Sequence, residues 1–429
     1  MNRYRLMILM CFLFCLSNSF LTYAQTIEIV NRNVEVFRME EFHQRGGLPN
    51  FFKKLNSQRR LHIGYIGGSI TEAKEGWADL VFNWFKLNYP LIAFCQTNIA
   101  IGGTGSDLGV FRIERDLLVY NPDLVFVEYA VNDSGRNSES VMSSMEGIVR
   151  KIWANSPLTD ICFVYTTAKE FVPDMVMGKQ METVKVMEEL ADYYQIPSIN
   201  MGLPVARLYA SGELALAADP LENSNRIVFS KDGVHPLLES GHPIYASLVG
   251  KYLKQMSDFC GMTNCRLIKP YVKNNWERAK MINVSEALLL GDWKILPKEH
   301  MVVRDCNVGM PVIYQGEPGA SLKFKFKGNV FGFFDCIGPG TGIIDVSVDG
   351  KMLEQSRFDP WCSGYRKHCF LIDNLSDGIH EVEVLVTNKV VDKRKILQTN
   401  NIVIDDLKLY SETCWYPTSV LIIGELVNE

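Results

Sequence analysis

Four short motifs along this chain carry the residue types that acyl transfer through a serine requires. In chain order they are Gly67-Gly68-Ser69-Ile70-Thr71, Gly102-Gly103, Asn132-Asp133 and Asp232-Gly233-Val234-His235. Such a set offers a hydroxyl nucleophile, hydrogen-bond donors for an oxyanion, and a histidine base with an orienting carboxylate. Each motif alone is common in turns and helix caps, so the hypothesis rests on their occurring together.

Ser69 and His235 are the expected nucleophile and base. Ser69 follows two glycines that end an apolar run, and glycine lets the backbone turn sharply and leave the next hydroxyl exposed. Asp232 lies three residues before His235, so one loop can bring its carboxylate to Nδ1 and leave Nε2 free for the serine proton. The alternatives are a helix-capping serine and an ordinary surface loop. His242, in a Gly-His-Pro context at a helix start, is the rival histidine and is expected to be structural.

A carbonyl oxygen that gains negative charge during acyl transfer needs hydrogen-bond donors already in place. We expect these donors to be the backbone N–H groups of Ser69 and Gly103 and the side-chain amide of Asn132. The alternatives are a turn glycine at Gly103 and a turn or helix cap at Asn132-Asp133. The cysteines lack Cys-x-x-Cys spacing and no His cluster accompanies them, so we expect neither a metal nor a cofactor.

The motifs need a scaffold that brings them together, and residues 61–257 indicate one. Short apolar runs alternate with segments of helical spacing, which favours a three-layer α/β domain around a parallel sheet. Ligands of such sheets bind beyond the carboxyl ends of the strands, and Ser69, Gly103 and Asn132 follow the first three strands. The predicted strands are 61–66, 91–97, 123–129, 161–165 and 197–200, and the predicted helices are 77–87, 140–154, 181–194 and 245–256.

Beyond about residue 280 the pattern changes to period two. Residues 321–326, 343–348, 380–386 and 402–409 alternate between apolar and polar, and Asp-Gly pairs at 349–350 and 377–378 are typical of hairpin turns. This predicts an all-β sandwich. We therefore expect a signal peptide at 1–24, an α/β domain at 25–259, a connector at 260–283, a β-sandwich at 284–411 and a C-terminal tail at 412–429. Within 25–56 we expect an added strand and helix.

The N-terminus has the pattern of a secretory signal. Arg3 and Arg5 precede the apolar run 6–16, and Thr22-Tyr23-Ala24 places small residues before a cleavage point, so the mature chain would begin at Gln25. The alternative is an uncleaved anchor helix. No later run has the ~20 apolar residues of a membrane span, so we expect a secreted or periplasmic protein with no integral membrane segment.

The composition, with 47% hydrophobic and 22% charged residues, is globular. The formal charge is −5, and it becomes more negative when Arg3 and Arg5 leave with the signal. Without a basic run, such a chain is a poor nucleic-acid binder, and we expect no nucleic-acid partner. Cys260 with Cys265, and Cys362 with Cys369, are each able to form a disulfide in a secreted chain or to stay free.

The sequence resembles the SGNH, or GDSL-type, superfamily of serine hydrolases across residues 60–257. The resemblance is carried by residues 67–71, by Asn98 with Gly103, by residues 128–133 and by residues 232–236. It implies a flavodoxin-like sheet, a Ser69-His235-Asp232 triad, and an oxyanion hole made by the N–H groups of Ser69 and Gly103 and the Asn132 side chain. Two positions depart from the pattern: Gly68 stands where the family usually has Asp, and Ala130 where it usually has Gly.

The superfamily includes lipases, thioesterases and carbohydrate O-acetylesterases, and an appended β-domain is similar to the glycan-acting members. The resemblance implies a secreted esterase that removes O-acetyl or other short acyl groups, with acylated carbohydrate as its substrate. Trp361 and Tyr365 would stack on sugar rings if exposed, or belong to the core if not. Two alternatives stay open: a lipid-acting esterase or thioesterase, and a catalytically inactive glycan-binding protein.

Overall fold

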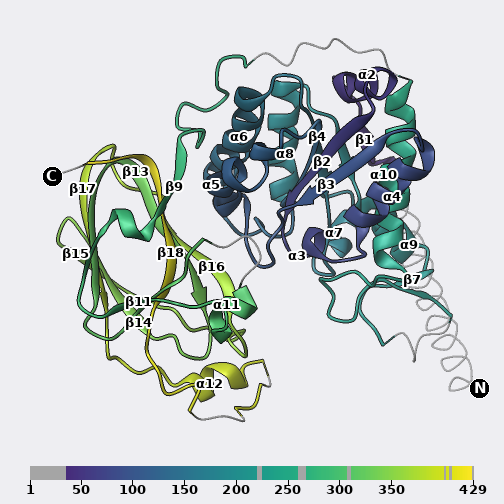
Figure 1. The fold of residues 1–429 in the computed structure, drawn as a ribbon. Helices are drawn as coiled ribbons and strands as arrows, with labels where there is room; N and C mark the ends of the chain where they lie inside the picture. The colour runs from purple at the N-terminus through teal and green to yellow at the C-terminus, as the bar shows by residue number, and fades with distance from the viewer. Residues whose placement is uncertain are drawn as a thin grey trace, which may run out of the picture.

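The computed structural model describes residues 35–219, 225–258, 267–306, 311–400, 402–404 and 408–427, which fold as two domains (Figure 1). The expected signal segment, residues 1–24, and the pair Cys260 and Cys265 lie outside the described residues. Cys362 and Cys369 are both free thiols, so no disulfide joins them.

The first domain is built on a six-stranded sheet with the order β1-β6-β5-β4-β2-β3. Strands β2 to β6 are parallel, and the short β1 pairs antiparallel with β6. The first parallel strand lies between the second and third, which is the flavodoxin-like order. The strands are β1 (Phe42–His43), β2 (Arg60–Gly67), β3 (Ala93–Asn98), β4 (Leu124–Glu128), β5 (Asp160–Tyr165) and β6 (Ser198–Asn200).

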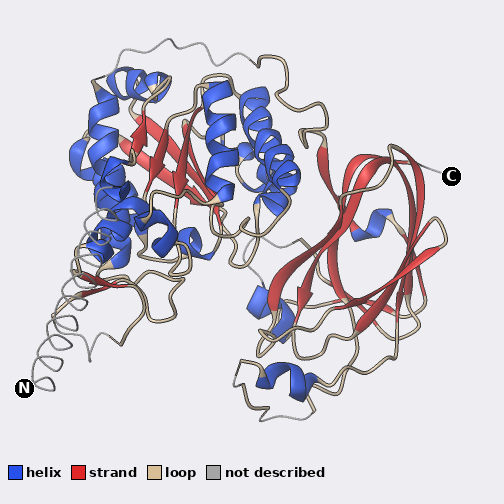
Figure 2. Cartoon of the chain, turned by 180° about the vertical axis from the view of Figure 1, so that it is seen from behind, coloured by secondary structure: helices blue, strands red, loops and turns tan. Residues whose placement is uncertain are grey.

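Helices cover both faces of this sheet (Figure 2). Helices α5 (Ser106–Asp116), α6 (Ser138–Asn155) and α8 (Glu182–Tyr194) bury their apolar sides against one face. The other face carries α2 (Pro49–Ser57), α4 (Trp77–Asn88), α7 (Val172–Val176), α9 (Gly202–Ala210) and α10 (Gly241–Ser257). The predicted three-layer α/β architecture is therefore confirmed, and β1 with α2 accounts for the strand and helix expected before residue 57.

The second domain is an antiparallel β-domain, as the period-two pattern predicts. Its main sheet has eight strands, with β13 at the centre because it pairs with β10, β16, β17 and β18. The strands are β9 (Ala279–Asn283), β10 (Leu288–Leu290), β13 (Ser321–Ile337), β14 (Ile343–Val348), β15 (Lys351–Ser356), β16 (Arg366–Ile372), β17 (Gly378–Val386) and β18 (Tyr416–Leu426); β11 (Trp293–Ile295) and β12 (Tyr314–Gly316) form a separate pair, and α11 (Met301–Cys306) and α12 (Lys393–Gln398) are short helices.

Two predicted boundaries of this domain are wrong. Residues 412–429 are not a tail, since they contain β18, which pairs along β13 and with β9. Strand β9 in turn lies inside the stretch expected to be a connector. The reason is that β18 is buried on both faces: Val420 and Ile422 enter the core of the β-domain, while Leu421 and Ile423 join the core of the first domain. A strand buried on both faces has no period-two alternation.

The strand prediction for 402–409 is also wrong for the residues of this range that the structure describes. Residues 402–404 lie outside any strand and 408–410 form a turn. Ile402, Ile404 and Tyr410 pack instead beside Leu397 of α12 in a small apolar cluster. An alternating sequence can satisfy such a local cluster as well as a sheet, because both need apolar side chains on one side only.

The two domains share one hydrophobic core. Trp276, between the domains, is 5% exposed and packs beside Phe111 of α5, with 6.1 Å between ring centroids. Its backbone N–H donates to the carbonyl of Ser143 in α6 at 3.0 Å. From the β-domain, Phe334 lies against the Arg112 guanidinium, 5.9 Å from ring centroid to Cζ. The second domain is thus part of the packing of α5 and α6.

Trp276→Ala should destabilise the whole protein by about 3–5 kcal/mol, because it removes a buried indole at the junction of both domains. Urea unfolding followed by fluorescence and circular dichroism measures the loss. Trp361→Ala, which removes an indole that is 66% exposed, is the matched control and should change stability by about 0.5 kcal/mol at most. A Trp276→Ala protein as stable as the control would show that the shared core contributes little.

Candidate active site

The sheet brings the predicted motifs to one edge. Ser69 opens the four-residue helix α3 (Ser69–Glu72) directly after β2, Gly103 lies in the loop after β3, and Asn132 lies in the loop after β4. The loop with Asp232 and His235 precedes α10 and is closed by a bridge between Ser230 and Pro236. All five predicted site residues therefore come from loops at the carboxyl ends of the strands or from the loop that faces them.

Ser69, His235 and Asp232 form a continuous hydrogen-bonded chain. Ser69 Oγ lies 2.9 Å from His235 Nε2, and His235 Nδ1 lies 2.6 Å from Asp232 Oδ2. An ionised carboxylate can only accept, so Nδ1 carries the proton and Nε2 is left as the acceptor for the serine hydroxyl. This is the geometry in which a histidine can take a proton from a serine as it attacks.

The Asp232 carboxylate accepts hydrogen bonds from three further donors besides the His235 imidazole. Its Oδ1 accepts from Ser230 Oγ and from the backbone N–H groups of Val234 and His235, each at 2.8 Å. Partial burial alone would raise the pKa of Asp232, but these hydrogen bonds and the one from the His235 ring hold that pKa well below its usual range. Asp232 is therefore ionised at any pH near neutral.

The loop after β3 separates the roles of its two glycines. The N–H of Gly102 donates to Glu72 Oε2 at 2.7 Å, so that donor is already used. No hydrogen bond within the described residues engages the N–H of Gly103, which is exposed. Gly103 has φ of +70°, a conformation that a residue with a side chain rarely adopts. The structure thus leaves Gly103, rather than Gly102, with a free donor at this rim.

The side chain of Asn132 packs against the backbone of Gly68, the residue before Ser69. A Cβ added to Gly68 would stand 1.8 Å from Asn132 Oδ1 and 2.7 Å from Nδ2, so a side chain at Gly68 and this amide position exclude one another. Gly68, one of the two departures from the SGNH pattern, leaves the space that the Asn132 side chain fills here. The Asn132 amide therefore lies next to Ser69, as a donor to a bound carbonyl oxygen would have to.

Two supporting residues, Glu128 and Asn98, hold the nucleophile turn; both lie in the motifs that carry the SGNH resemblance, but this supporting role was not predicted from the sequence. Glu128, at the end of β4, is fully buried and accepts from Thr71 Oγ1 at 2.9 Å and Thr166 Oγ1 at 2.6 Å. Burial raises the pKa of Glu128, against the hydrogen bonds from Thr166, Thr71 and the Gly68 backbone. Asn98 Nδ2 donates to the Thr71 carbonyl at 2.6 Å and ties β3 to the same turn.

His242 has the structural role that its sequence context predicts. It is 2% exposed, and its Nδ1 accepts the Trp77 N–H at the start of α4 at 3.0 Å. Burial, with His235 nearby, lowers the pKa of His242 to about 4. His242 is therefore neutral near pH 7 and fixed on a backbone amide, which leaves His235 as the base candidate.

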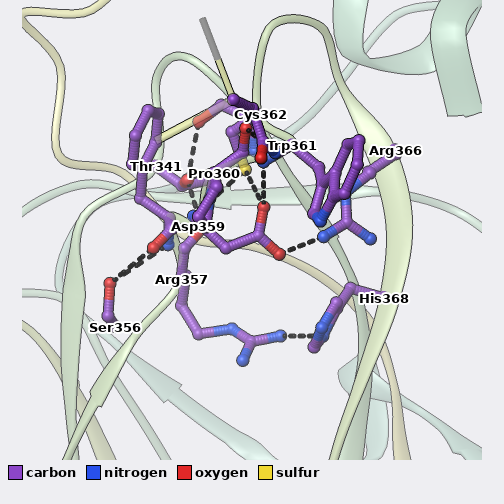
Figure 3. Close-up of polar contacts among 12 residues, drawn as sticks. Thr341, Ser356, Arg357, Asp359, Pro360, Trp361, Cys362, Arg366 and His368 are labelled. Carbon is purple, nitrogen blue, oxygen red and sulfur yellow. Dashed lines mark hydrogen bonds and ion pairs between the residues drawn. The ribbon is translucent and has the colours of Figure 1, made fainter. Parts of the chain in front are cut away.

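The second domain reaches the rim of the site, which sequence reasoning did not foresee. A Cβ built on Gly103 would have Arg366 Nη1, from β16, at 3.8 Å. Arg366 forms an ion pair with Asp359, whose Oδ1 accepts the Trp361 N–H at 2.9 Å (Figure 3). Trp361 is 66% exposed, whereas Tyr365 is buried and belongs to the core. Of the two aromatic residues considered for stacking on sugar rings, only Trp361 is exposed.

Comparison with solved structures identifies the fold. A two-domain esterase (CEX) active on acetylated mannans, co-crystallized with mannopentaose, superposes with a TM-score of 0.70 over 91% of this chain and 98% of that chain, at 21% sequence identity. The same esterase without the sugar gives a TM-score of 0.71 over 90% of this chain and 98% of that chain. This chain has the fold of that two-domain esterase. No family model matches the sequence, and no curated protein matches it.

Asp232→Asn should lower kcat on the order of 10⁴-fold, the cost that loss of the orienting carboxylate carries in serine proteases. The same change should lower the melting temperature at pH 7, and the difference should disappear as the pH falls. The direction of this pH dependence follows from the lowered pKa of Asp232. The ionised carboxylate stabilises the folded state at pH values above the pKa of Asp232 in the unfolded chain, about 4. That stabilisation is lost as the pH falls toward the lower pKa of the folded protein. Melting curves at several pH values, with the exposed Asp377→Asn as control, measure this; an unchanged difference down to pH 2 would contradict it.

Asn132→Ala should lower kcat about 10²-fold or more and leave KM nearly unchanged, since the amide is expected to bind charge that exists only in the transition state. Steady-state kinetics on p-nitrophenyl acetate measure both constants. Asn155→Ala, at the far end of α6, serves as the control. A raised KM with kcat intact would make Asn132 a substrate-binding group instead.

Proposed function

We propose that this protein is a serine esterase that removes O-acetyl or other short acyl groups from carbohydrate through a covalent acyl-enzyme. The observation that carries this proposal is the chain from Ser69 Oγ to His235 to Asp232, at 2.9 and 2.6 Å, beside the Gly103 N–H, which no hydrogen bond within the described part of the chain engages. A nucleophile with its base and the base with its orienting acid is the arrangement that ester hydrolysis needs.

In the first half-reaction, Ser69 Oγ attacks the ester carbonyl carbon while His235 Nε2 takes the hydroxyl proton. The carbonyl oxygen gains a negative charge, which the N–H groups of Ser69 and Gly103 and the Asn132 amide stabilise. The ester C–O bond then breaks, and His235 returns its proton to the departing sugar oxygen. Water, activated by the same His235, hydrolyses the acyl-Ser69 bond and releases the carboxylic acid.

Three features favour a glycan substrate. The side chains of His235 and Asp232 are 53% and 54% exposed, so the site is open enough to admit a polymer. The exposed Trp361 belongs to the loop that pairs with Arg366 at the site rim, and an aromatic face is a surface on which sugar rings stack. The fold, over both domains, is that of an esterase described as active on acetylated mannans.

The lipid-acting alternative would need an apolar cleft that encloses an acyl chain. The exposure of His235 and Asp232 is less suited to this than to a short acyl group on an extended sugar chain. The inactive glycan-binding alternative is disfavoured by the intact chain of hydrogen bonds. Both alternatives predict a different outcome of the experiments below.

We also propose that the protein is exported, on the strength of the signal pattern in residues 1–24. Among the residues that the structure describes, no helix combines the length and apolar character needed to cross a membrane.

Ser69→Ala should abolish deacetylation without loss of fold, since no other hydroxyl is expected to attack. The fall in rate should be several orders of magnitude. The test is acetate release from acetylated mannan and xylan beside long-chain p-nitrophenyl esters, for wild type, Ser69→Ala and the surface control Ser211→Ala. More than about a tenth of the activity in a folded Ser69→Ala protein would disprove the mechanism, and a preference for long-chain esters would support the lipid-acting alternative.

Trp361→Ala should raise KM for acetylated polysaccharide several-fold and leave kinetics on p-nitrophenyl acetate unchanged, because stacking acts on sugar rings and not on the acyl group. Tyr120→Ala is the matched control, since Tyr120 is an exposed aromatic that precedes β4, at the opposite edge of the sheet. Equal KM values for both variants on the polymer would remove Trp361 from substrate binding.

A further inference from the structure

We propose that Asp133 is a positioning residue that fixes Asn132 and Gly103 relative to each other, and so sets the geometry of the oxyanion hole. This inference rests on the proposed function, because it concerns the same site. Asp133 does not face the nucleophile; it is fully buried behind Asn132, its neighbour in the chain. Its role would therefore be exerted through other residues.

The Asp133 carboxylate joins the loop after β4 to the loop after β3. Its Oδ1 accepts the N–H of Ser106, the first residue of α5, at 3.0 Å. Gly103 lies three residues before that N–H, so the bond anchors the end of the loop that carries the exposed donor. On its own side, the Asp133 N–H donates to the Tyr129 carbonyl at 2.9 Å, which fixes the turn that carries Asn132.

The fit around this carboxylate is tight. A Cβ added to Gly105 would stand 2.2 Å from Asp133 Oδ1, so the loop after β3 approaches the carboxylate as closely as only a glycine allows. A small shift of Asp133 would therefore move the backbone that leads to Gly103. Tight packing of this kind transmits displacement from one loop to the other, because neither has free space to absorb it.

A carboxylate at this place is costly, which argues that it has a role beyond filling space. Asp133 Oδ2 is buried and has no hydrogen-bond partner among the described residues. Burial raises the pKa of Asp133 to about 6, although Arg136 opposes this effect. A buried polar atom without a partner costs free energy of folding, so an apolar side chain would be better tolerated if only packing mattered.

Arg136 connects the same carboxylate to a second acid. Its Nη1 lies 3.0 Å from Asp133 Oδ1, and its Nη2 lies 3.5 Å from Asp107 Oδ2. Arg136 belongs to the same loop as Asn132, so the Asp107–Arg136 ion pair also joins α5 to that loop, while Asp107 Oδ1 accepts the Leu108 N–H within α5. Asp107→Ala is thus a matched control that removes this ion pair and leaves the hydrogen bond between Asp133 and Ser106 intact.

The experiment compares Asp133→Ala and Asp107→Ala with wild type in the full-length protein, on p-nitrophenyl acetate, with rates normalised to folded protein. Alanine is used because asparagine would keep an Oδ1 that can still accept the Ser106 N–H. For Asp133→Ala we expect kcat to fall about tenfold or more at unchanged KM, because the donors are displaced only from the position that the transition state needs. Asp107→Ala should keep kcat within twofold. A kcat for Asp133→Ala equal to that of the control would overturn the proposal.

A second variant removes the donor instead of the acceptor. Ser106→Pro deletes the N–H that Asp133 accepts, at a helix position where proline is tolerated. It also removes the buried hydroxyl that bonds to Ser144 Oγ at 2.6 Å, so Ser106→Ala, which loses the hydroxyl and keeps the N–H, is its control. Relative to that control, Ser106→Pro should reproduce the fall in kcat even if Asp133→Ala folds poorly. Normal kcat in Ser106→Pro would show that the link between the loops is not needed for catalysis, and would overturn the proposal independently.

A double variant separates positioning from general loss of stability. If Asp133 acts through the oxyanion donors, Asp133→Ala should cost much less in an Asn132→Ala background, about threefold where wild type loses tenfold. Fully additive losses would contradict the proposal. Failure of the underlying function is distinguishable, since it would appear as activity that survives in Ser69→Ala, whereas failure of this inference would leave Ser69→Ala inactive and Asp133→Ala normal.

Discussion

The candidate site depends on the common direction of parallel strands. Strands β2, β3 and β4 are neighbours or near neighbours in one sheet and end at the same edge, so Ser69, Gly103 and Asn132 meet although they are far apart in sequence. Only the Asp232–His235 loop comes from outside these strands. It is held to the same edge by the Lys169 N–H, which donates to the Gly233 carbonyl at 2.6 Å. The chemistry therefore follows from sheet topology before any single contact is considered.

Two buried acids at the end of β4 extend this arrangement. Glu128 bonds to the nucleophile turn and to Thr166 after β5, and Asp133 bonds to the start of α5. Both carry a raised pKa because of burial. An acid of this kind favours the folded state most at low pH, and that contribution is lost as pH rises through the folded pKa, about 6 for Asp133. Glu128 and Asp133 thus connect β4 and the loop after it to neighbouring segments, but keeping these buried acids ionised near neutral pH lowers the stability of the folded state.

Sequence reasoning predicted the first domain well and the second only in class. The parallel strands are short, apolar and followed by glycines or polar turns, and this pattern can be recognised without knowledge of tertiary contacts. Helix α5 was missed because its start, Gly105-Ser106, depends on the remote Asp133 carboxylate for its cap. Strand β18 was missed because it faces two cores. The position of the predicted triad residues followed from motif spacing, whereas Arg366 gave no local signal, since only the packing of the domains brings β16 to Gly103.

The place of β18 also bears on the order in which the molecule is made. A ribosome releases the chain from its N-terminus, so β18, residues 416–426, emerges after the other strands of the two domains that the structure describes. Until then β13 and β9 lack the strand that lies between them, and the apolar faces of α5 and α6 lack part of their cover. The loops of the candidate site emerge far earlier, whereas part of the packing behind them does not. The protein therefore cannot reach its final structure domain by domain during synthesis.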